Sequence, residues 1–437
     1  MESVTVQKTL TPLSGSLAFP GDKSLSHRAI MFGSLADGVS EFTNVLAGED
    51  CVRTRKAFEA MGVAIEGLSP THLKIKGRGL RSLRAPKKEL YLGNSGTSMR
   101  LLLGILAGFD FDAVLTGDPS LSSRPMRRVT DHLKAMGARI EGRQDGNFAP
   151  IKIHGGNLKA IDARLSIPSA QVKSALLLAG LYAEGQTSVT EPARSRDHTE
   201  KFLSYFGAPI EQKGLRVSVN GSAPGKGPLR AKSFEIPGDI SSAAFFIALS
   251  ILVPKSSIQF RSVLWNPTRT GLLAVLKRMG VDVRVDRLHA GGPEPAADFT
   301  LTRRALGAFE IEKNELPALI DEVPILAVLA TQAEGTSIIH DAEELRVKET
   351  DRIHSMVTTL SQMGASIAAE GNSLVIKGPT PLHGAPVDSF RDHRTAMALV
   401  IAGLVAEGKT TVKDTECVRT SFPDFFELLK KCGTAIC

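Results

Sequence analysis

Residues 133–142 read LKAMGARIEG, in which the last turn of a helical pattern is followed by a glycine and then by a β-like run. A glycine directly after a helix is typical of the left-handed conformation that ends helices. The phrase recurs along the chain, at FEAMGVAIEG (58–67), LKAMGARIEG (133–142), LSYFGAPIEQ (203–212), LKRMGVDVRV (276–285), LSQMGASIAA (360–369) and LLKKCGTAI (428–436). The near-regular spacing predicts six copies of one structural module.

A second repeated element is a polar start that opens an apolar helix rich in small residues. It occurs at KSLSHRAIMFGSLADG (23–38), NSGTSMRLLLGILAG (94–108), SAQVKSALLLAGLYAEG (169–185), DISSAAFFIALSILVP (239–254), DEVPILAVLATQAEG (321–335) and DHRTAMALVIAGLVAEG (392–408). Helices that are apolar nearly all round are buried, whereas the charged helices before the repeated glycines suit a solvent-facing position. With β-patterned runs such as LKIKG and LRVSVNG between them, each module is predicted to be mixed α/β.

The segment NGSAPGKGPLR (220–230) is rich in Gly and Pro and lacks apolar periodicity, which indicates a connection. It separates three modules from three. Because one module cannot cover its own apolar helix, we expect the three buried helices of each half to pack into one core. A length of 437 residues also suits two large domains.

The composition narrows the class of protein. The start MESVTVQKTLTPLSG lacks the pattern of a signal peptide, and no apolar stretch is long enough to cross a bilayer, so we expect a cytoplasmic protein. The cysteines show neither a CxxC pair nor zinc-ligand spacing with histidine, so we expect neither disulfides nor a metal site. They are Cys51, Cys417, Cys432 and Cys437.

A net charge of +7 and a pI near 9.2 favour anionic partners. One Trp, three Tyr and the lack of a basic run interleaved with aromatics argue against nucleic acid and favour a small acidic metabolite. If the buried helices of each half run in the same direction, their positive N-terminal ends point into one cleft between the halves and form an anion-binding site.

Polar residues gather at these helix starts. They are Lys23, Ser24, Ser26, Arg28, Asn94, Ser95, Thr97, Arg100, Ser169, Gln171, Asp321, His393 and Arg394. Ser, Thr and Asn are ordinary helix caps, so a structural reading accounts for them as well as a functional one does. Lys23, Arg28 and Arg394 on apolar helices are harder to explain as caps.

The chain resembles the enolpyruvyl transferase family, and within it the 5-enolpyruvylshikimate-3-phosphate synthases, over essentially its full length. The matching segments are PGDKSLSHRA (20–29), LGNSGTSMRLL (92–102), GDPSLSSRPM (117–126), IPSAQVKSALLLAGL (167–181), RDHTE (196–200), RVKETDR (346–352), DHRTAMA (392–398) and SFPDF (421–425). Any one of these short motifs would be weak, but all of them in order are specific.

The resemblance implies an α/β fold of two domains, each with three βαβαββ-like repeats, buried helices and outer sheets, and an active site in the interdomain cleft. It also implies that the first strand belongs to the second domain. The predicted domains are therefore residues 21–232, and residues 1–20 together with 233–437. The implied activity is transfer of the enolpyruvyl group of phosphoenolpyruvate to the 5-hydroxyl of shikimate 3-phosphate. The reaction requires no cofactor or metal, and we expect a monomer.

The resemblance also implies the ligands of each substrate. For shikimate 3-phosphate they are Lys23, Ser24, Arg28, Ser169, Ala170, Gln171, Arg196, Asp321 and Lys348. For phosphoenolpyruvate they are Lys23, Gly96, Arg124, Gln171, Arg352 and Arg394. Arginine forks and serine hydroxyls suit the phosphate and carboxylate groups of both substrates.

The proton transfers implied by this activity need a base at the 5-hydroxyl and an acid at the methylene carbon. We assign the base to Asp321 and the acid to Glu349, with Lys23 sharing the proton work. The structural alternatives are that Asp321 only caps its helix and that Glu349 only pairs with a surface cation.

Two positions depart from the better-known pattern. Ala170 replaces the second serine of a Ser-Ser-Gln run, and Thr420 stands where a lysine is usual. These features resemble the second class of the family, often associated with tolerance of the inhibitor glyphosate. Arg419 lies next to Thr420, but a one-residue offset usually points a side chain elsewhere.

Two other functions compete with this reading. UDP-N-acetylglucosamine enolpyruvyl transferases share the sixfold architecture but carry a cysteine in the loop before RPM, and GDPSLSSRPM has none. A polyanion-binding protein without enzymatic activity is the second alternative, and it rests on the bulk charge alone.

Overall fold

The repeated glycines each follow a helix, as the sequence predicts. A computed structural model describes residues 2–222, 227–303, 305–434 and 436. All six glycines have positive φ, from 79° at Gly433 to 111° at Gly137. After five of these glycines the next residue donates its N–H to a carbonyl five residues back, as Ala138 does to Leu133 at 3.0 Å. The helix ends are therefore capped in the same way from repeat to repeat.

The chain divides into two compact units. The N-terminal unit comprises Gly21–Ile236 and Gly291–Glu294, and the C-terminal unit comprises Met1–Pro20, Pro237–Ala290 and Pro295–Cys437. Residues 223–226, in the middle of the predicted connection at 220–230, lie outside the described residues. The described part of the chain holds no helix long and apolar enough to cross a membrane.

In the N-terminal unit, each of three four-stranded sheets packs against one inner helix. The inner helices are α1 (Lys23–Leu35), α3 (Gly96–Leu106) and α7 (Ala170–Gly180), and the other helices are α2 (Glu49–Ala60), α4 (Pro119–Ser122), α5 (Arg127–Ala135), α6 (Arg143–Gly146) and α8 (His198–Tyr205). The sheets, in strand order, are β14 (Ser233–Glu235), β3 (Asp37–Thr43), β5 (His72–Arg78), β4 (Ala64–Ser69); β6 (Leu90–Tyr91), β7 (Asp112–Thr116), β9 (Phe148–His154), β8 (Arg139–Gly142); and β10 (Asp162–Arg164), β11 (Gln186–Thr190), β13 (Arg216–Asn220), β12 (Ile210–Lys213).

The C-terminal unit repeats this plan. Its inner helices are α9 (Ile240–Leu252), α11 (Val323–Thr331) and α13 (His393–Gly403), and the others are α10 (Gly271–Arg278), α12 (Arg352–Gln362), α14 (Phe425–Lys431), η1 (Leu316–Ala318), η2 (Glu343–Val347) and η3 (Thr415–Thr420). Its sheets are β16 (Val281–His289), β17 (Ala296–Arg303), β15 (Ser257–Leu264), β2 (Ser14–Ala18); β18 (Glu310–Ile311), β19 (Gly335–Ile339), β21 (Ser373–Gly378), β20 (Ser366–Glu370); and β1 (Val4–Gln7), β23 (Lys409–Lys413), β22 (Pro386–Asp388).

The predicted contrast between inner and outer helices is confirmed. Every residue of α11 and of α13 is buried. In the outer helix α14, by contrast, the buried residues are Phe425 and Leu429. The apolar surface of each unit is thus covered by its own inner helices and sheets.

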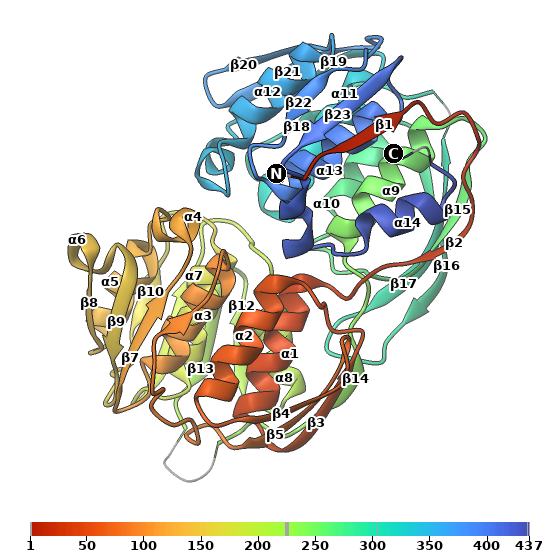
Figure 1. Cartoon of the computed structure of the whole chain (residues 1–437). Helices are drawn as coiled ribbons and strands as arrows, with labels where there is room; N and C mark the ends of the chain where they lie inside the picture. The colour runs from red at the N-terminus through yellow and green to blue at the C-terminus, as the bar shows by residue number, and fades with distance from the viewer. Residues whose placement is uncertain (1, 223–226, 304, 435, 437) are drawn as a thin grey trace. The chain divides into compact units, whose positions relative to one another are not determined.

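Three of the sheets are completed by a strand that lies far away in the sequence. β2 pairs in parallel with β15, and β1 pairs antiparallel with β23, so the first residues of the chain complete sheets of the C-terminal unit (Figure 1). β14 pairs in parallel with β3 of the N-terminal unit. The sequence-based boundary at residue 232 falls just before β14, which this pairing ties to the N-terminal unit.

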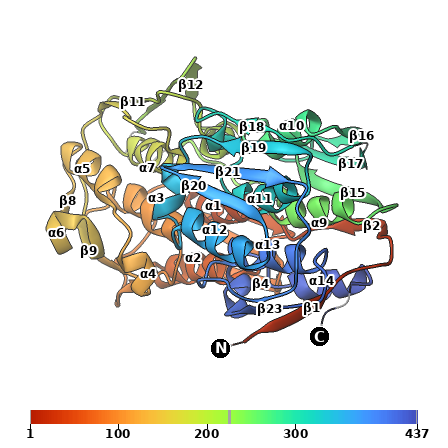
Figure 2. The same cartoon turned by 90° about the horizontal axis from the view of Figure 1, so that it is seen from above.

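Both chain ends lie beside the sheet that contains β1. Figure 2 shows the two termini near β1, β23 and α14. Val6 forms an isolated antiparallel bridge with Ile436, and Thr415 donates its N–H to the Glu2 carbonyl at 3.0 Å.

Candidate active site

Each inner helix of the N-terminal unit starts with a capping side chain. Asp22, Ser95 and Ser169 accept the backbone N–H three residues on, at 2.9, 3.2 and 3.4 Å respectively. The predicted ligand Ser169 therefore does the work of a helix cap, and Ala170 begins α7 directly after it.

Arg28 is buried between three helices of this unit. Its guanidinium donates to Thr199 Oγ1 at 2.8 Å, to Ser174 Oγ at 3.0 Å and to the Ser24 carbonyl at 3.0 Å. Burial lowers the pKa of Arg28 to about 10, although Glu200 and other nearby carboxylates act in the opposite direction. The group stays charged at neutral pH, so it supplies fixed positive charge beside Ser24.

Lys23, the first residue of α1, forms an ion pair with the buried carboxylate of Asp50 on α2. Arg196 is half-buried just before α8, which begins at His198. Both predicted cations therefore lie at the start of a helix of the N-terminal unit.

Gly96, Arg124 and Gln171, three of the predicted phosphoenolpyruvate ligands, come together around Arg100. Gln171 Oε1 accepts from Arg100 Nη1 at 2.6 Å. A Cβ atom added at Gly96 would lie 2.8 Å from Arg100 Nη1 and 3.4 Å from Arg124 Nη1. The missing side chain of Gly96 therefore leaves room for two guanidinium groups at the start of α3.

A buried charge cluster supports the start of α7. Lys173 Nζ lies 2.7 Å from Glu191 Oε2 and 2.7 Å from Glu200 Oε1, and Glu191 Oε1 accepts the Ser169 N–H at 3.0 Å. Burial alone would lower the pKa of Lys173, but the two carboxylates outweigh it and raise that pKa above its ordinary value. The cluster links Ser169 to the helix that follows Arg196.

The C-terminal unit contains a second group of predicted ligands, centred on Arg352. This side chain is 1% exposed and donates to Asp392 Oδ2 at 2.9 Å, Glu349 Oε2 at 2.7 Å and Asp321 Oδ1 at 3.4 Å. Burial alone would lower the pKa of Arg352, but the three carboxylates raise it above its ordinary value. The guanidinium is therefore charged and holds both predicted proton-transfer residues.

Arg394 joins the same group. Its Nε lies 3.6 Å from Asp321 Oδ1, and its Nη1 donates to the Asp321 carbonyl at 3.2 Å. Its own helix is capped by Asp392, whose Oδ1 accepts from the backbone N–H groups of Arg394 and Thr395. Two arginines thus converge on Asp321.

The helix-cap alternative for Asp321 does not fit this geometry. α11 begins at Val323 after the N-cap residue Glu322, and Asp321 lies one residue further back. The ion-pair alternative for Glu349 does describe its contact with Arg352, but that guanidinium is buried and not on a charged surface. Lys348 lies next to Glu349, directly after η2.

Thr420, which stands where a lysine is usual, makes a local hydrogen bond. Thr420 donates its hydroxyl to the Cys417 carbonyl at 2.7 Å. The Arg419 side chain is 65% exposed and pairs with Glu2 at 3.0 Å, so its guanidinium lies at the surface of the C-terminal unit.

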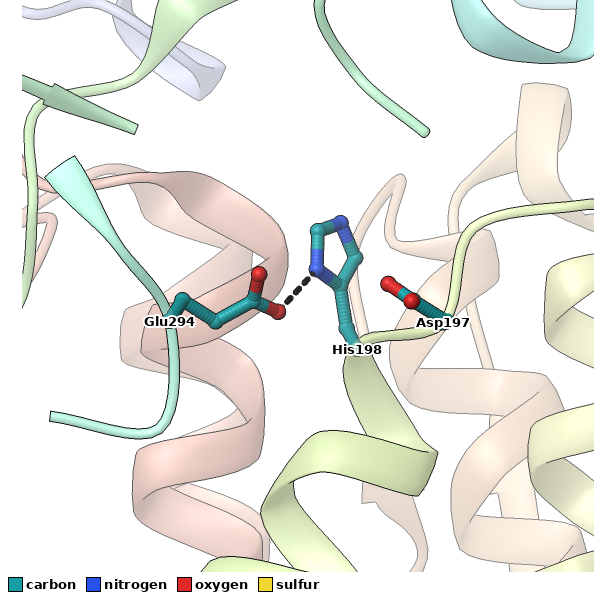
Figure 3. Close-up of side chains that lie close together, drawn as sticks. All are labelled: Asp197, His198 and Glu294. Atoms are coloured by element: carbon teal, nitrogen blue, oxygen red, sulfur yellow. Dashed lines mark hydrogen bonds and ion pairs between the residues drawn. The ribbon is translucent and has the colours of Figure 1, made fainter. Parts of the chain in front are cut away.

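Two groups of described residues have the donors for a metal ion: Asp197, His198 and Glu294, and Glu310, Glu312 and His340. In the first, His198 Nδ1 lies 2.6 Å from Glu294 Oε1, and both side chains are buried (Figure 3). Asp197 lies on the other side of the imidazole ring (Figure 3). A hydrogen bond already joins His198 and Glu294 of the first group, and the second group is mostly exposed.

Sequence reasoning missed the buried polar residues behind these ligands. Asp392, Lys173, Glu191 and Glu200 contact predicted ligands or their helices but were not predicted as part of the site. A lysine inside the apolar run SAQVKSALLLAG and an aspartate directly before His393 were the available signals.

Comparison with known proteins gives one consistent result. A family model described as EPSP synthase (3-phosphoshikimate 1-carboxyvinyltransferase) matches residues 7–429. A protein of Shouchella clausii named 3-phosphoshikimate 1-carboxyvinyltransferase is 48% identical over 425 residues, which cover 97% of this chain and 98% of the relative. A Bacillus cereus protein of the same name is 47% identical over 431 residues and 99% of both chains.

Solved structures agree with these relatives. The structure of an EPSP synthase from Acinetobacter baumannii superposes with a TM-score of 0.89 at 42% identity, covering 100% of this chain and 99% of that one. A second structure from the same organism gives a TM-score of 0.88 at 41% identity. The predicted two-domain α/β fold is confirmed by this similarity.

Proposed function

The chain belongs to the EPSP synthase family of 3-phosphoshikimate 1-carboxyvinyltransferases, and on that premise we propose which of its residues bind the substrates and move the protons. The enzyme transfers the enolpyruvyl group of phosphoenolpyruvate to the 5-hydroxyl of shikimate 3-phosphate and releases phosphate. This reaction is a step of the shikimate pathway and of aromatic amino-acid biosynthesis.

The single observation that carries the assignment of roles is the position of Asp321 and Glu349 on the same buried guanidinium, Arg352. Two carboxylates held in place by one cation can serve as separate proton carriers, because neither has to reorganise as charge develops.

In the proposed addition step, Asp321 removes the proton of the 5-hydroxyl as its oxygen bonds to C2 of phosphoenolpyruvate. Glu349, in its acid form, gives its proton to C3, which becomes a methyl group. In the elimination step the Glu349 carboxylate takes a proton back from that methyl group, the C2–phosphate bond breaks, and the proton on Asp321 leaves with the phosphate. Lys23 and the arginines stabilise the negative charge of the leaving group.

The proposal gives one set of ligands to each substrate, and Lys23 and Gln171 belong to both sets. The proposal gives shikimate 3-phosphate to Lys23, Ser24, Arg28, Ser169, Ala170, Gln171, Arg196, Asp321 and Lys348. It gives phosphoenolpyruvate to Lys23, Gly96, Arg124, Gln171, Arg352 and Arg394. The support for the phosphoenolpyruvate set is that Gly96, Arg124 and Gln171 lie together in the N-terminal unit and that Arg352 and Arg394 lie together in the C-terminal unit.

A phosphate-release assay tests these roles, with UDP-N-acetylglucosamine as the alternative acceptor. Asp321→Asn keeps the shape of the side chain but removes the base, so we expect kcat to fall by about 10²–10⁴-fold with a much smaller change in the KM for shikimate 3-phosphate. Asp341→Asn, at an exposed position of the same unit, is the control. Near-normal turnover by Asp321→Asn would reject the base assignment.

We also propose that the enzyme acts in the cytoplasm as a monomer, without a nucleic-acid partner. The support is compositional: the chain lacks a basic run interleaved with aromatics. Size-exclusion chromatography with light scattering at micromolar concentration tests the oligomeric state, and a dimer mass would overturn it.

A further inference from the structure

Four buried side chains from three helices of the N-terminal unit form a continuous hydrogen-bonded series. His27 Nδ1 on α1 lies 2.7 Å from Thr54 Oγ1 on α2, which lies 2.6 Å from Ser98 Oγ on α3. Ser98 Oγ lies 2.7 Å from Ser95 Oγ, the cap of the same helix. None of the four residues is more than 1% exposed. We call His27, Thr54, Ser98 and Ser95 the hydroxyl network.

One assignment of protons satisfies every hydroxyl of the network. Thr54 donates to the carbonyl of Asp50 at 3.2 Å, so its oxygen accepts from both His27 Nδ1–H and the Ser98 hydroxyl. Ser98 in turn accepts from the Ser95 hydroxyl, while Ser95 also accepts the Ser98 backbone N–H. Each hydroxyl therefore donates once, and the series has one direction, from Ser95 to Thr54.

His27 anchors the other end of the network as a neutral imidazole. Burial, followed by the charges of Lys23 and Arg28, lowers its pKa well below the ordinary value. Its Nε2 atom has no hydrogen-bond partner among the described residues. A neutral ring with its proton on Nδ1 fits both facts, since Nε2 then carries only a lone pair.

The network ends at the wall that is assigned to phosphoenolpyruvate. Ser95 stands between Asn94 and Gly96 at the start of α3. Asn94 accepts from Arg124 through its backbone carbonyl at 3.3 Å and through its side-chain oxygen. The position of Ser95 therefore fixes its two neighbours, Asn94, which accepts from Arg124, and Gly96, which faces Arg124.

We propose that the hydroxyl network is a positioning device for phosphoenolpyruvate: it fixes the start of α3 and, through Asn94 and Gly96, the guanidinium of Arg124. This inference rests on the proposed assignment of Gly96 and Arg124 to that substrate. In this proposal the members of the network are positioning residues, because they act through the start of α3.

Thr54→Val tests the proposal, since valine keeps the shape of threonine and removes the central hydroxyl. The variant leaves His27 Nδ1–H and the Ser98 hydroxyl without their acceptor, so Ser95 loses its support. We expect the KM for phosphoenolpyruvate to rise about threefold to thirtyfold, with a change of less than about twofold in the KM for shikimate 3-phosphate. Thr54→Ser restores the hydroxyl and should return the KM for phosphoenolpyruvate to near the wild-type value.

Two further variants keep the test decisive. Ser98→Ala breaks the network at the next hydroxyl and should give the same selective effect if Thr54→Val does not fold. Thr359→Val removes a buried helical hydroxyl of the C-terminal unit that donates to the Ser355 carbonyl at 2.7 Å, and both KM values should stay unchanged. Equal changes in the two KM values, or a lower melting temperature with no change in either, would overturn the positioning role.

Arg124→Ala separates this inference from the proposed function. If Arg124→Ala raises the KM for phosphoenolpyruvate but Thr54→Val and Ser98→Ala do not, the network is only structural and the assigned site stands. If Arg124→Ala itself leaves that KM unchanged, the assignment of the site is wrong.

Discussion

Arg352 donates its Nε–H to Asp392 Oδ2 at 2.9 Å, and both side chains are almost completely buried. The other oxygen of the same carboxylate caps the helix that carries Arg394. A single carboxylate therefore orients one proposed phosphoenolpyruvate ligand by an ion pair and the second by ending its helix.

Asp392→Asn separates these two tasks. An amide can still cap the helix through its oxygen, but its NH₂ group then faces the Arg352 donor, so the buried guanidinium loses a counter-charge. We expect the free energy of unfolding to fall by about 3 kcal/mol and the KM for phosphoenolpyruvate to rise at least about tenfold. Denaturant titration and steady-state kinetics measure the two effects. Asp424→Asn, at the exposed N-cap of α14 where no side-chain cap bond is made, should change neither.

Gly96→Ala tests the wall at the start of α3. The added methyl group would meet the ends of Arg100 and Arg124, and crowding of a packed pocket costs about 1–3 kcal/mol. Glyphosate is longer than phosphoenolpyruvate, so it should bear more of that cost. We expect the inhibition constant of glyphosate to rise more than the KM for phosphoenolpyruvate. Equal changes, or a larger penalty on the substrate, would mean that Gly96 does not form this wall.

The buried His27 predicts part of the pH dependence of stability. Its pKa is lowered in the folded protein, so the unfolded chain binds more protons as pH falls below about 6.5. Stability is therefore lost as pH falls from that point toward the folded pKa, with a slope from this group of up to about 1.4 kcal/mol per pH unit. His27→Gln removes this proton linkage, and denaturant unfolding at several pH values should show a shallower acid limb. An identical slope in the variant would show that His27 titrates normally in the folded state.

Removal of metal ions should leave turnover unchanged. His198 Nδ1 already pairs with the Glu294 carboxylate. The same carboxylate acts to raise the pKa of Arg28, so a bound cation would have to compete with that guanidinium for Glu294. Dialysis against a chelator followed by the phosphate-release assay checks this. The opposite result would be that dialysis removes the activity, that a divalent cation restores it, and that His198→Gln prevents this restoration. That result would assign a metal to Asp197, His198 and Glu294.

The repeating part of the fold could be predicted from the sequence because it depends on local signals. A glycine after a helix and an apolar helix with a polar start carry their conformation in a few neighbouring residues. The pairing of strands that lie far apart in the sequence could not be predicted in this way. Nothing local to Ser233–Glu235 indicates that this strand pairs with β3, so the predicted boundary at residue 232 separates β14 from the strand with which it pairs.

In the candidate site, too, some features could be predicted from the sequence and others could not. Residues in matched motifs, such as Arg124 and Arg352, could be named from the sequence. The contacts that hold them could not, because Asp392 lies 40 positions from Arg352 and Thr54 lies 44 positions from Ser98. Such partners are specified by packing between helices, which a single sequence does not report.

The placement of β1 and β2 has a consequence for how the chain is made. Residues 4–18 emerge from the ribosome before the residues that follow them in the sequence, yet β2 and β1 can pair only after their partners β15 and β23 have also emerged. Except for residues 291–294, the N-terminal unit can close earlier, as soon as β14 has emerged. Because Val6 bridges Ile436, a short linker could join the first and last residues of this sequence. A circular permutant opened between Pro20 and Gly21 would then make the C-terminal unit contiguous apart from residues 291–294. In such a permutant, the two strands would be synthesised after the sheets that they complete.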